Sequence, residues 1–256
     1  SEPQIARIAA AGLIPLSGME ASLGAIAAAA SIHPAHHVPV IAAPIVTDAT
    51  ILDEAASKAF LQPYGLDLPQ NLVVKRQALP DTLPFGYPVV LKAMGQAHKS
   101  EMGGVKLNLA DRAELEAAMT EMKQPIYLIE EMVGDGLIEL LVGVVADPAH
   151  GYLLTLAAGG VLTEILKDSV SLSLPVEEAD ILTALEKLKI APLLAGYRGK
   201  PAVDKAALVT AVLAVQDCVL DNRASFSEIE LNPLILTPTR AVAVDALIKT
   251  GGKSRG

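Results

Sequence analysis

The sequence predicts an α+β protein in which helices pack on antiparallel sheets in two subdomains. Two β-rich segments, 125–133 and 137–147, are separated only by Gly-Asp-Gly and predict two strands. The segments 227–236 and 240–248 predict a terminal hairpin around a Thr-Pro-Thr turn. Strands grouped in this way, with helical patterns before and after them, indicate α+β. A cleft between the two subdomains is the expected ligand site.

The chain divides into three predicted parts. Residues 1–31 are rich in alanine and contain two helix-like runs around Gly-Leu-Ile-Pro-Leu-Ser-Gly, which predicts an α-β-α piece of a larger sheet. Residues 32–50 are a predicted linker, because they contain three prolines and three histidines without helical or alternating periodicity. We expect these histidines to be solvated, since a proline-broken segment does not fix metal-ligand geometry. Residues 51–256 form the main domain.

Local patterns predict the elements from residue 47 onward. The run 47–62 has a polar start, acidic early residues and apolar residues at helical spacing, and Pro63 and Gly65 end it. Asp111 is the predicted N-cap of the next helix. The predicted helices span 47–62, 109–122, 181–188 and 205–219. The predicted strands span 72–74, 88–92, 125–133 and 137–147, with two short strands around the glycine pair of 152–166.

Composition excludes several functional classes. Hydrophobic residues make up 52% of the chain, but they are scattered among charges without an uninterrupted apolar span of membrane length. Only 3% of residues are aromatic and tryptophan is absent, so neither a carbohydrate platform nor a base-stacking surface is expected. The net charge of −9 argues against binding to a nucleic-acid backbone, but it leaves room for a local cationic pocket.

The single cysteine and the N-terminal residues bear on the compartment. Cys218 excludes an internal disulfide, and its apolar helical surroundings favour a buried small hydrophobe over a nucleophile. The first twelve residues lack a basic region followed by an apolar core, so no signal peptide is expected. We therefore expect a cytoplasmic protein.

The terminal hairpin brings possible metal ligands together. If Thr237 pairs with Arg240, Asn232 lies directly opposite Asp245, with the two side chains about 5 Å apart on one face. Glu230, two residues before Asn232, points the same way. A carboxylate and a carboxamide on adjacent strands suit Mg²⁺, which completes its shell with water and phosphates. An asparagine that satisfies a turn and an aspartate that ends a strand explain the residues equally well.

Two further features suggest a nucleotide site. The segment 128–133 places Glu130 and Glu131 before Met132 and Val133. It resembles an adenine hinge, in which a carboxylate accepts from the exocyclic amine and the backbone meets the ring edge; an exposed acidic strand end is the alternative. Lys92, a cation at the end of a core strand, fits a contact with phosphate oxygens. The alternative is a lysine that extends from the sheet edge into solvent.

The loop 93–105, AMGQAHKSEMGGV, carries a His-Lys-Ser-Glu cluster between two glycine breaks, which a simple connector does not need. The loop belongs to a longer set of motifs: GYPVVLKAMGQAHKSEMGGVKLNL, LIEEMV, ELLVGVVADPAHG, AAGGVLTEILKD, PLLAGYRGKP, and EIELNPLIL with AVDALI. In this order they resemble the ATP-grasp domain of nucleoside-diphosphate-forming acyl-CoA synthetases, a family related to succinyl-CoA synthetase. The resemblance covers residues 51–248.

The resemblance implies roles for individual residues. In ADP-forming members of the family, a phosphoryl group moves from an acyl phosphate to a histidine of the CoA-binding module, and a mobile segment carries it to the ATP-grasp site. His98 is then the catalytic residue that receives it, with glycine amides close to the phosphate. ATP or ADP and Mg²⁺ are the implied cofactors, with Asn232 and Asp245 as metal ligands. The implied nucleotide-binding residues are Lys92, Gly103, Gly104, Glu130, Glu131, Val133, Glu139, Gly159 and Gly160, with Glu164 nearby.

The resemblance also implies the function. The chain is then the nucleotide-binding, phosphoryl-transfer part of a synthetase that converts acid, CoA and ATP into acyl-CoA, ADP and phosphate through a phosphohistidine relay. Residues 51–256 become an ATP-grasp domain, residues 1–31 the tail of a CoA-ligase domain, and a fused or separate CoA-binding module the partner. No nucleic-acid or membrane partner is expected. The alternative is a catalytically lapsed regulatory module of a protein lysine acetyltransferase. In one departure from the pattern, no Arg closely follows Asp168.

Overall fold

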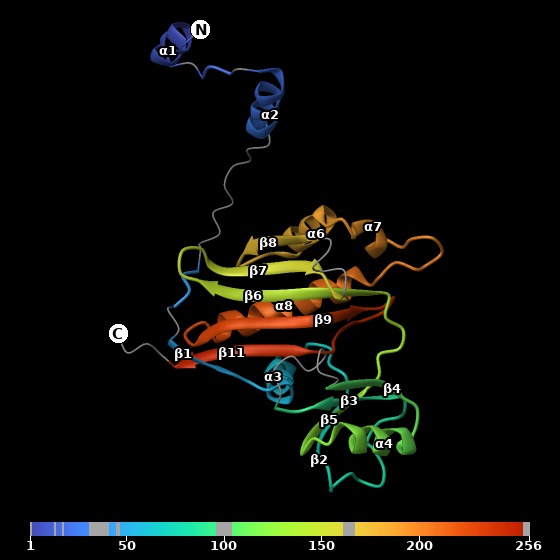
Figure 1. The fold of residues 1–256 in the computed structure, drawn as a ribbon. Coiled ribbons are helices and arrows are strands. Elements are labelled where there is room, and N and C mark those ends of the chain that lie inside the picture. The colour runs from blue at the N-terminus through green and yellow to red at the C-terminus, as the bar shows by residue number, and fades with distance from the viewer. Residues whose placement is uncertain are drawn as a thin grey trace. The chain divides into compact units, whose positions relative to one another are not determined.

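The computed structural model describes residues 2–12, 14–16, 18–30, 41–44, 47–95, 104–160 and 167–252. The chain divides into two compact units, Ser1–Pro39 and Val40–Gly256. Helices α1 (Glu2–Ala10) and α2 (Met19–Ala30) form the first unit (Figure 1). The strand predicted between them is wrong, because residues 14–16 have no regular structure and Ile14 is 85% exposed. A strand needs a neighbour for its backbone N–H and C=O groups, and the described residues of this unit offer none.

The second unit contains two antiparallel sheets, as the sequence predicts (Figure 1). In the described part of the chain, the larger sheet has seven strands in the order β1-β11-β9-β6-β7-β8, with β10 paired to β9. Its strands are β1 (Thr47–Ile51), β6 (Ile138–Asp147), β7 (Gly151–Ala158), β8 (Ser169–Ser173), β9 (Phe226–Leu236), β10 (Ala241–Ala243) and β11 (Ala246–Gly252).

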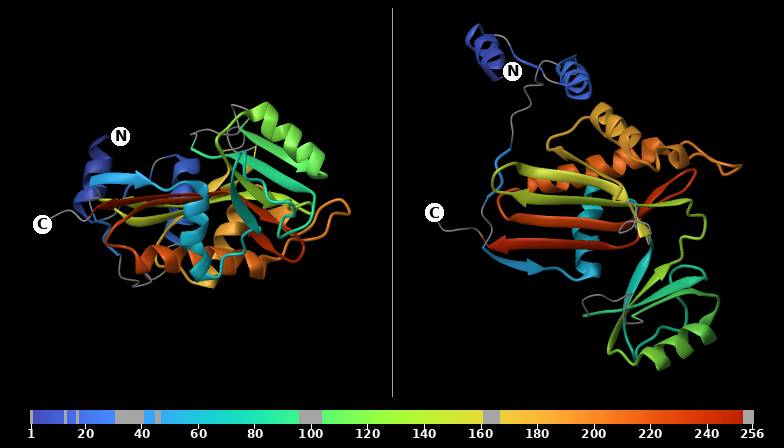
Figure 2. Two further views of the ribbon diagram at one scale, coloured as in Figure 1. Left: turned by 90° about the horizontal axis from the view of Figure 1, so that it is seen from below. Right: turned by 45° about the horizontal axis from the view of Figure 1, so that its top comes forward.

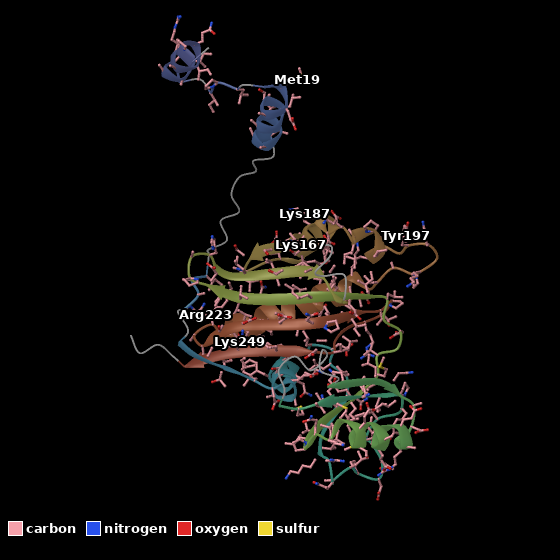
Figure 3. The ribbon with its side chains drawn as sticks, in the orientation of Figure 1. Met19, Lys167, Lys187, Tyr197, Arg223 and Lys249 are labelled. Carbon is pink, nitrogen blue, oxygen red and sulfur yellow. The ribbon has the colours of Figure 1, made fainter. Side chains whose placement is uncertain are left out.

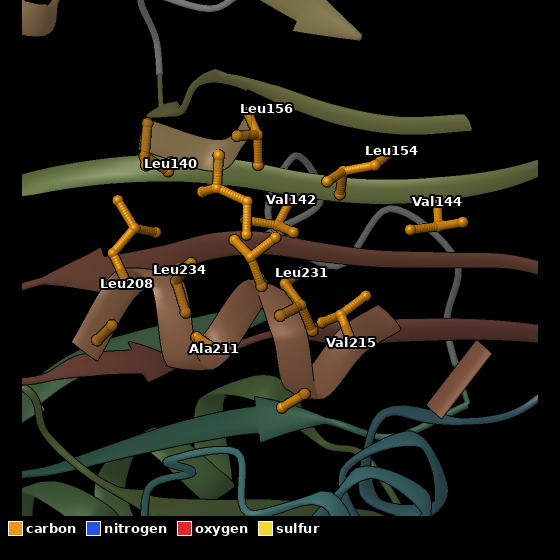
Figure 4. Close-up of a cluster of buried hydrophobic side chains, with 14 of the residues drawn as sticks. Leu140, Val142, Val144, Leu154, Leu156, Leu208, Ala211, Val215, Leu231 and Leu234 are labelled. Atoms are coloured by element: carbon orange, nitrogen blue, oxygen red, sulfur yellow. The ribbon is translucent and has the colours of Figure 1, made fainter. Parts of the chain in front are cut away.

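Alternation along the strands explains why helices cover one face of the larger sheet. On β6, Leu140, Val142 and Val144 are fully buried, whereas the residues between them are partly exposed. Figure 4 shows these side chains packed on α8 (Lys205–Asp221). Helix α6 (Glu178–Lys187) packs against β8 and α8. Both helices confirm the predicted segments, whereas the short α7 (Ala191–Leu194) was not predicted.

The smaller sheet has the order β2-β5-β3-β4. Its strands are β2 (Asn71–Lys75), β5 (Ile126–Glu131), β3 (Val89–Ala93) and β4 (Val105–Leu109). Helix α4 (Arg112–Met122) packs on one face, and its N-cap is Asp111, whose carboxylate accepts the N–H of Glu114 at 2.9 Å. The predicted cap and three predicted strands are confirmed. Strand β4 follows the loop 93–103 and was missed.

The predicted helix over 47–62 is wrong in its first part. Residues 47–51 form β1, which pairs with β11 at the edge of the larger sheet, and the helix α3 is shorter (Glu54–Leu61). Asp53 caps it by accepting the N–H of Ala56 at 2.8 Å, and a 3₁₀ turn, η1 (Gln62–Tyr64), follows. The helix predicted from the spacing of apolar residues is present from residue 54 onward. The β-branched residues of 47–51 favour a strand, but its hydrogen-bonding partner is β11, which is distant in the sequence.

The terminal hairpin has the predicted register. Ala241 pairs with Leu236, and Lys249 pairs with Glu228, so the pair sums stay constant through β10 and most of β11. The Thr237 N–H donates to the Arg240 carbonyl at 2.9 Å, as the turn assignment requires. This register places Asn232 opposite Asp245.

Other predictions fall partly outside the described residues. One strand of 152–166 is β7, while 161–166 is not described. Of the predicted linker 32–50, residues 32–40, 45 and 46 are not described, and residues 47–50 belong to β1 and not to a linker. No described helix has the length and apolar character needed to span a membrane. The left view of Figure 2 shows α8 along one face of the larger sheet and the smaller sheet toward the other face at one end.

Two adjacent valines of β6 test the packing of this core. Val144 is fully buried against α8, whereas Val145 is 42% exposed. We expect Val144→Ala to lower the free energy of unfolding by about 2 kcal/mol, since two buried methyl groups are lost and a cavity remains. Val145→Ala is the matched control and should change it by less than about 0.5 kcal/mol. Equal losses in urea denaturation would contradict the assigned strand faces.

Candidate functional site

A cleft of about 710 Å³ lies between the two sheets, within the usual size range of small-molecule sites. Residues of both sheets line it, together with the segment that joins β5 to β6 and helix α7. The lining residues are Val90, Lys92, Val105, Leu107, Glu130, Glu131, Met132, Val133, Gly134, Gly136, Leu137, Ile138, Glu139, Ala158, Gly159, Gly160, Ile190, Leu193, Pro233, Ile235, Val244 and Asp245.

Part of this cleft is suited to a flat apolar group. Val90 and Leu107 of the smaller sheet and Pro233 and Ile235 of β9 provide apolar walls. Leu107 is 61% exposed because it faces the open cleft. Apolar walls from two sheets can enclose a planar ring such as a nucleotide base.

The segment joining β5 to β6 provides polar backbone groups beside these walls. At its start, the Met132 N–H donates to the Pro88 carbonyl at 3.2 Å; at its end, the Leu137 N–H donates to the Leu236 carbonyl at 2.8 Å. Val133 and the residues after it line the cleft between these two anchors. A fixed backbone of this kind can bond to the edge of a ring, as predicted for Val133.

Four buried charged side chains form an ion-pair cluster where the two sheets meet: Glu54 and Lys58 of α3, Lys92 of β3 and Glu130 of β5. Lys92 Nζ lies 2.5 Å from Glu54 Oε1 and 2.8 Å from Glu130 Oε2. Lys58 Nζ lies 2.9 Å from Glu54 Oε1 and also donates to Glu130. Two cations and two anions make the ionised cluster neutral, which allows four charges to be buried together.

Both lysines of the ion-pair cluster also donate to one backbone carbonyl, that of Val244. The distances are 2.7 Å from Lys58 Nζ and 2.6 Å from Lys92 Nζ. The Val244 N–H donates to the Pro233 carbonyl on β9, but proline has no N–H with which to return the bond. The two ammonium groups therefore replace the missing ladder donor and occupy both lone pairs of the carbonyl.

The two lysines differ in pKa, although burial opposes the charged form of both. At Lys92 the attraction of three nearby carboxylates outweighs burial and raises the pKa. Those carboxylates belong to Glu54, Glu130 and Asp245. At Lys58 burial is the largest effect, the charge of Lys92 adds to it, and the pKa is lowered. Lys92 is therefore the more firmly charged of the two.

Lys92 and Glu130 border the cleft, as predicted, but their polar atoms are engaged. The Lys92 ammonium has three acceptors within reach, namely the two glutamates and the Val244 carbonyl. Each Glu130 oxygen is held by a lysine. The predicted direct contacts of both residues with a nucleotide stay predictions.

Of the two predicted metal ligands, Asp245 is among the residues that line the cleft and Asn232 is not. Asn232 is exposed on the opposite strand and donates its N–H to the Asp245 carbonyl at 3.3 Å. The Asn232 carboxamide also donates to Glu230 at 3.0 Å, which confirms the shared direction of these side chains. Among the described residues, no group of three or more His, Cys, Asp or Glu side chains could hold a metal. Two oxygen ligands fit Mg²⁺, because water and substrate phosphates complete its shell.

Gly159 and Gly160 lie against Glu139 of β6, at the edge of the cleft. The Gly159 N–H donates to the Glu139 carbonyl at 2.8 Å. A Cβ atom on Gly159 would lie 2.8 Å from the Glu139 carbonyl carbon, and one on Gly160 would lie 2.6 Å from Glu139 Oε2. Gly160 also has a φ of +69°, which residues with a side chain rarely adopt. The close approach of the β6 backbone therefore requires glycine at position 159, and the positive φ favours it at position 160.

The predicted residues His98, Gly103 and Glu164 lie outside the described residues. Gly104 is described: it is buried, and its carbonyl accepts the N–H of Ala93 at 2.8 Å. Lys92 pairs with Val105 in the β3–β4 ladder. Both ends of the loop that carries His98 are thus fixed next to Lys92 at the cleft.

Asp168 positions backbone that lines the cleft. Its buried carboxylate accepts the N–H groups of Lys189 and Ile190 at 2.7 and 3.0 Å. These bonds hold the turn that begins α7, whose Leu193 lines the cleft together with Ile190. Asp168 therefore positions the backbone at the start of α7.

Sequence reasoning missed Glu54 and Lys58. An acid and a base four residues apart on a helix usually form an exposed pair, so the spacing gives no sign of burial. Both are nearly fully buried, with 4% and 1% exposure. The sequence offers one signal of their burial, which is their place in the first helix of the main domain.

Residues 45–250 match the family described as an ATP-grasp domain. The chain belongs to this family. This ATP-grasp chain is 31% identical over 210 residues to the acetate–CoA ligase [ADP-forming] I subunit beta of Pyrococcus furiosus, with 76% of this chain and 90% of the relative covered. It is 33% identical over 226 residues to trans-feruloyl-CoA synthase FCS1 of an unknown prokaryotic organism, with 82% of this chain covered but only 32% of that relative's length.

Solved structures agree with the ATP-grasp assignment. Acetyl-coenzyme A synthetase 1 of Ca. Korarchaeum cryptofilum, in complex with coenzyme A and Ca-AMPCP, matches with a TM-score of 0.73 and 30% identity, over 78% of this chain and 93% of that chain. The same protein with coenzyme A and Mg-AMPPCP, its phosphohistidine segment pointing towards the nucleotide-binding site, matches at 0.68 and 32%, over 77% and 91%. These relatives are CoA ligases and synthetases, and they give no support to the regulatory alternative.

Gly159 provides a test of the cleft edge in this ATP-grasp chain. We expect Gly159→Ala to push the backbone of Glu139 away and to destabilise the fold by about 1–3 kcal/mol, because the clash is with backbone that cannot rotate aside. Nucleotide affinity should fall with it, since the displaced backbone lines the cleft. Gly86→Ala is the control, because a Cβ there meets nothing within 4 Å. Thermal unfolding and ADP titration check both effects; a Gly159→Ala protein with unchanged stability and affinity would refute the close approach.

Proposed function

We propose that the chain is the nucleotide-binding, phosphoryl-transfer part of an ADP-forming acyl-CoA synthetase. The whole enzyme converts a carboxylic acid, CoA and ATP into acyl-CoA, ADP and phosphate. The observation that carries the proposal is the cleft between the two antiparallel sheets, with apolar walls at one part and the lysine charge and Asp245 at another. The similarity to beta subunits of ADP-forming acetate–CoA ligases supports the same assignment.

The nucleotide is proposed to lie along this cleft. Its base occupies the apolar walls with its edge against the backbone at Val133, and Glu131 of the same segment borders it. Its phosphates lie toward Lys92 and the glycine pair Gly159–Gly160. Lys92 is the cation of the ion-pair cluster that borders the cleft, and glycine permits the backbone to approach a phosphate closely.

Mg²⁺ is the proposed metal, with Asp245 and Asn232 as its protein ligands. Mg²⁺ held there by Asp245 and Asn232 would neutralise charge on the nucleotide phosphates. Asp245 is proposed to orient the nucleotide through this site, and its backbone carbonyl accepts the N–H of Asn232 at 3.3 Å.

His98 is the proposed phosphoryl acceptor. A neutral imidazole nitrogen forms an N–P bond to the γ-phosphorus of ATP while the bond to the bridging oxygen breaks and ADP leaves. In the synthetic direction of ATP use, the phosphoryl group then passes from His98 to a histidine of the CoA-binding module. The bond from the Ala93 N–H to the Gly104 carbonyl supports the proposal, because it fixes the described residues on either side of this segment beside Lys92.

The proposed partner is a CoA-binding module, fused or separate. The chain spans most of the Pyrococcus beta subunit but about a third of the feruloyl-CoA synthase, as expected if the other module carries the acyl and CoA sites. Residues 1–31 are proposed to be the tail of such a CoA-ligase domain. The cytoplasm is the proposed compartment, because the proposed substrates ATP and CoA are present there.

Phosphohistidine formation tests this proposal. The chain incubated with Mg·ATP is expected to gain a phosphate that is labile in acid and stable in base, as a phosphoramidate is. His98→Ala should abolish the label without changing ADP affinity, because the imidazole is a carrier and not a binding group. Phosphate on the nearby Ser100 would survive acid.

His150→Ala is the matched control for this experiment, since His150 is exposed in the turn after β6 and lies outside the cleft lining. It should label as the wild-type chain does. Acid-labile phosphate that persists in His98→Ala would contradict the assignment of His98, and failure of the wild-type chain to bind ADP at all would contradict the proposed function.

A further inference from the structure

Two charged residues of the ion-pair cluster lie behind the cleft. Glu54 and Lys58 are not among the residues that line it, yet they hold two that do, Lys92 and Glu130. Helix α3, which carries both, also contacts β11 of the larger sheet. The pair therefore connects the larger sheet to the two central strands of the smaller one.

The contact that matters most is the one to Val244. Lys58 and Lys92 both donate to its carbonyl, and the next residue is Asp245. The peptide plane between these residues contains that carbonyl, so fixing it also fixes the N–H and Cα of Asp245. The β9 ladder cannot supply this hold, because Pro233 lacks the N–H that would bond to Val244.

We propose that Glu54 and Lys58 are positioning residues of the metal–nucleotide site. Lys58 holds the Val244 carbonyl and thereby the orientation of the Asp245 carboxylate, while Glu54 fixes the two ammonium groups side by side. This inference rests on the proposed function. Lys58 is expected to affect how strongly Mg²⁺ supports nucleotide binding. It is not expected to affect the binding of the base, which depends on the apolar walls.

The experiment measures that coupling in the full chain. Calorimetry gives the Kd for ADP with Mg²⁺ and with EDTA, and their ratio reports how strongly the metal supports binding. Lys58→Met alone would leave two carboxylates against one buried cation and can prevent folding. Glu54→Gln/Lys58→Met removes one charge of each sign, so the remaining Lys92–Glu130 pair is neutral and the chain is expected to fold.

In the double variant we expect the Mg²⁺ coupling ratio to fall by about tenfold or more, as is usual when a group that orients a metal ligand is removed. The affinity for ADP in EDTA should stay within about threefold of wild type, because the base walls and Lys92 remain. Asp245→Asn is the positive control and should lose the coupling in the same way.

Glu228→Gln/Lys249→Met is the matched control. It makes the same substitutions in an ion pair between β9 and β11, whose Lys249 Nζ and Glu228 Oε2 are 2.5 Å apart. Neither residue lines the cleft, and Lys249 is labelled in Figure 3. Its coupling ratio should equal that of wild type. An unchanged ratio in Glu54→Gln/Lys58→Met, or an equal loss of affinity with and without Mg²⁺, would overturn the positioning role. Absence of ADP binding by the wild-type chain would instead overturn the proposed function.

Discussion

The carbonyl of Val244, held by two buried ammonium groups, is the contact on which the arrangement of this cleft depends. It arises from one residue of β9: Pro233 cannot return the ladder bond, so Lys58 and Lys92 approach instead. Two buried cations then require two buried anions, which α3 and β5 supply as Glu54 and Glu130. The same charges join the two sheets beside the cleft.

Much of the fold could be predicted because its signals are local. Asp111 caps α4 as its side-chain chemistry indicates, and the turn after Leu236 sets a register that places Asn232 opposite Asp245. Such predictions succeed where a short segment determines its own geometry. They fail where the partner is distant in sequence: the strand at 47–51 forms only because β11 is available to it.

The candidate site shows the same division. Asp245, Glu131 and the glycine pair could be located from motifs and strand register, and each lines the cleft. Glu54 and Lys58 could not, because the burial of an acid–base pair on a helix depends on tertiary contacts with Lys92 and Glu130 that no local pattern encodes. The resemblance to a known family added the proposed role of His98, which residue chemistry alone does not single out.

A crystal structure of the chain with Mg·ADP is the most direct test of this account. The account predicts the base between the walls formed by Leu107 and Ile235, the metal bound to Asp245, and both lysine bonds to the Val244 carbonyl intact. Nucleotide bound outside this cleft, or a metal bound at Asp245 while Lys58 has left Val244, would contradict it.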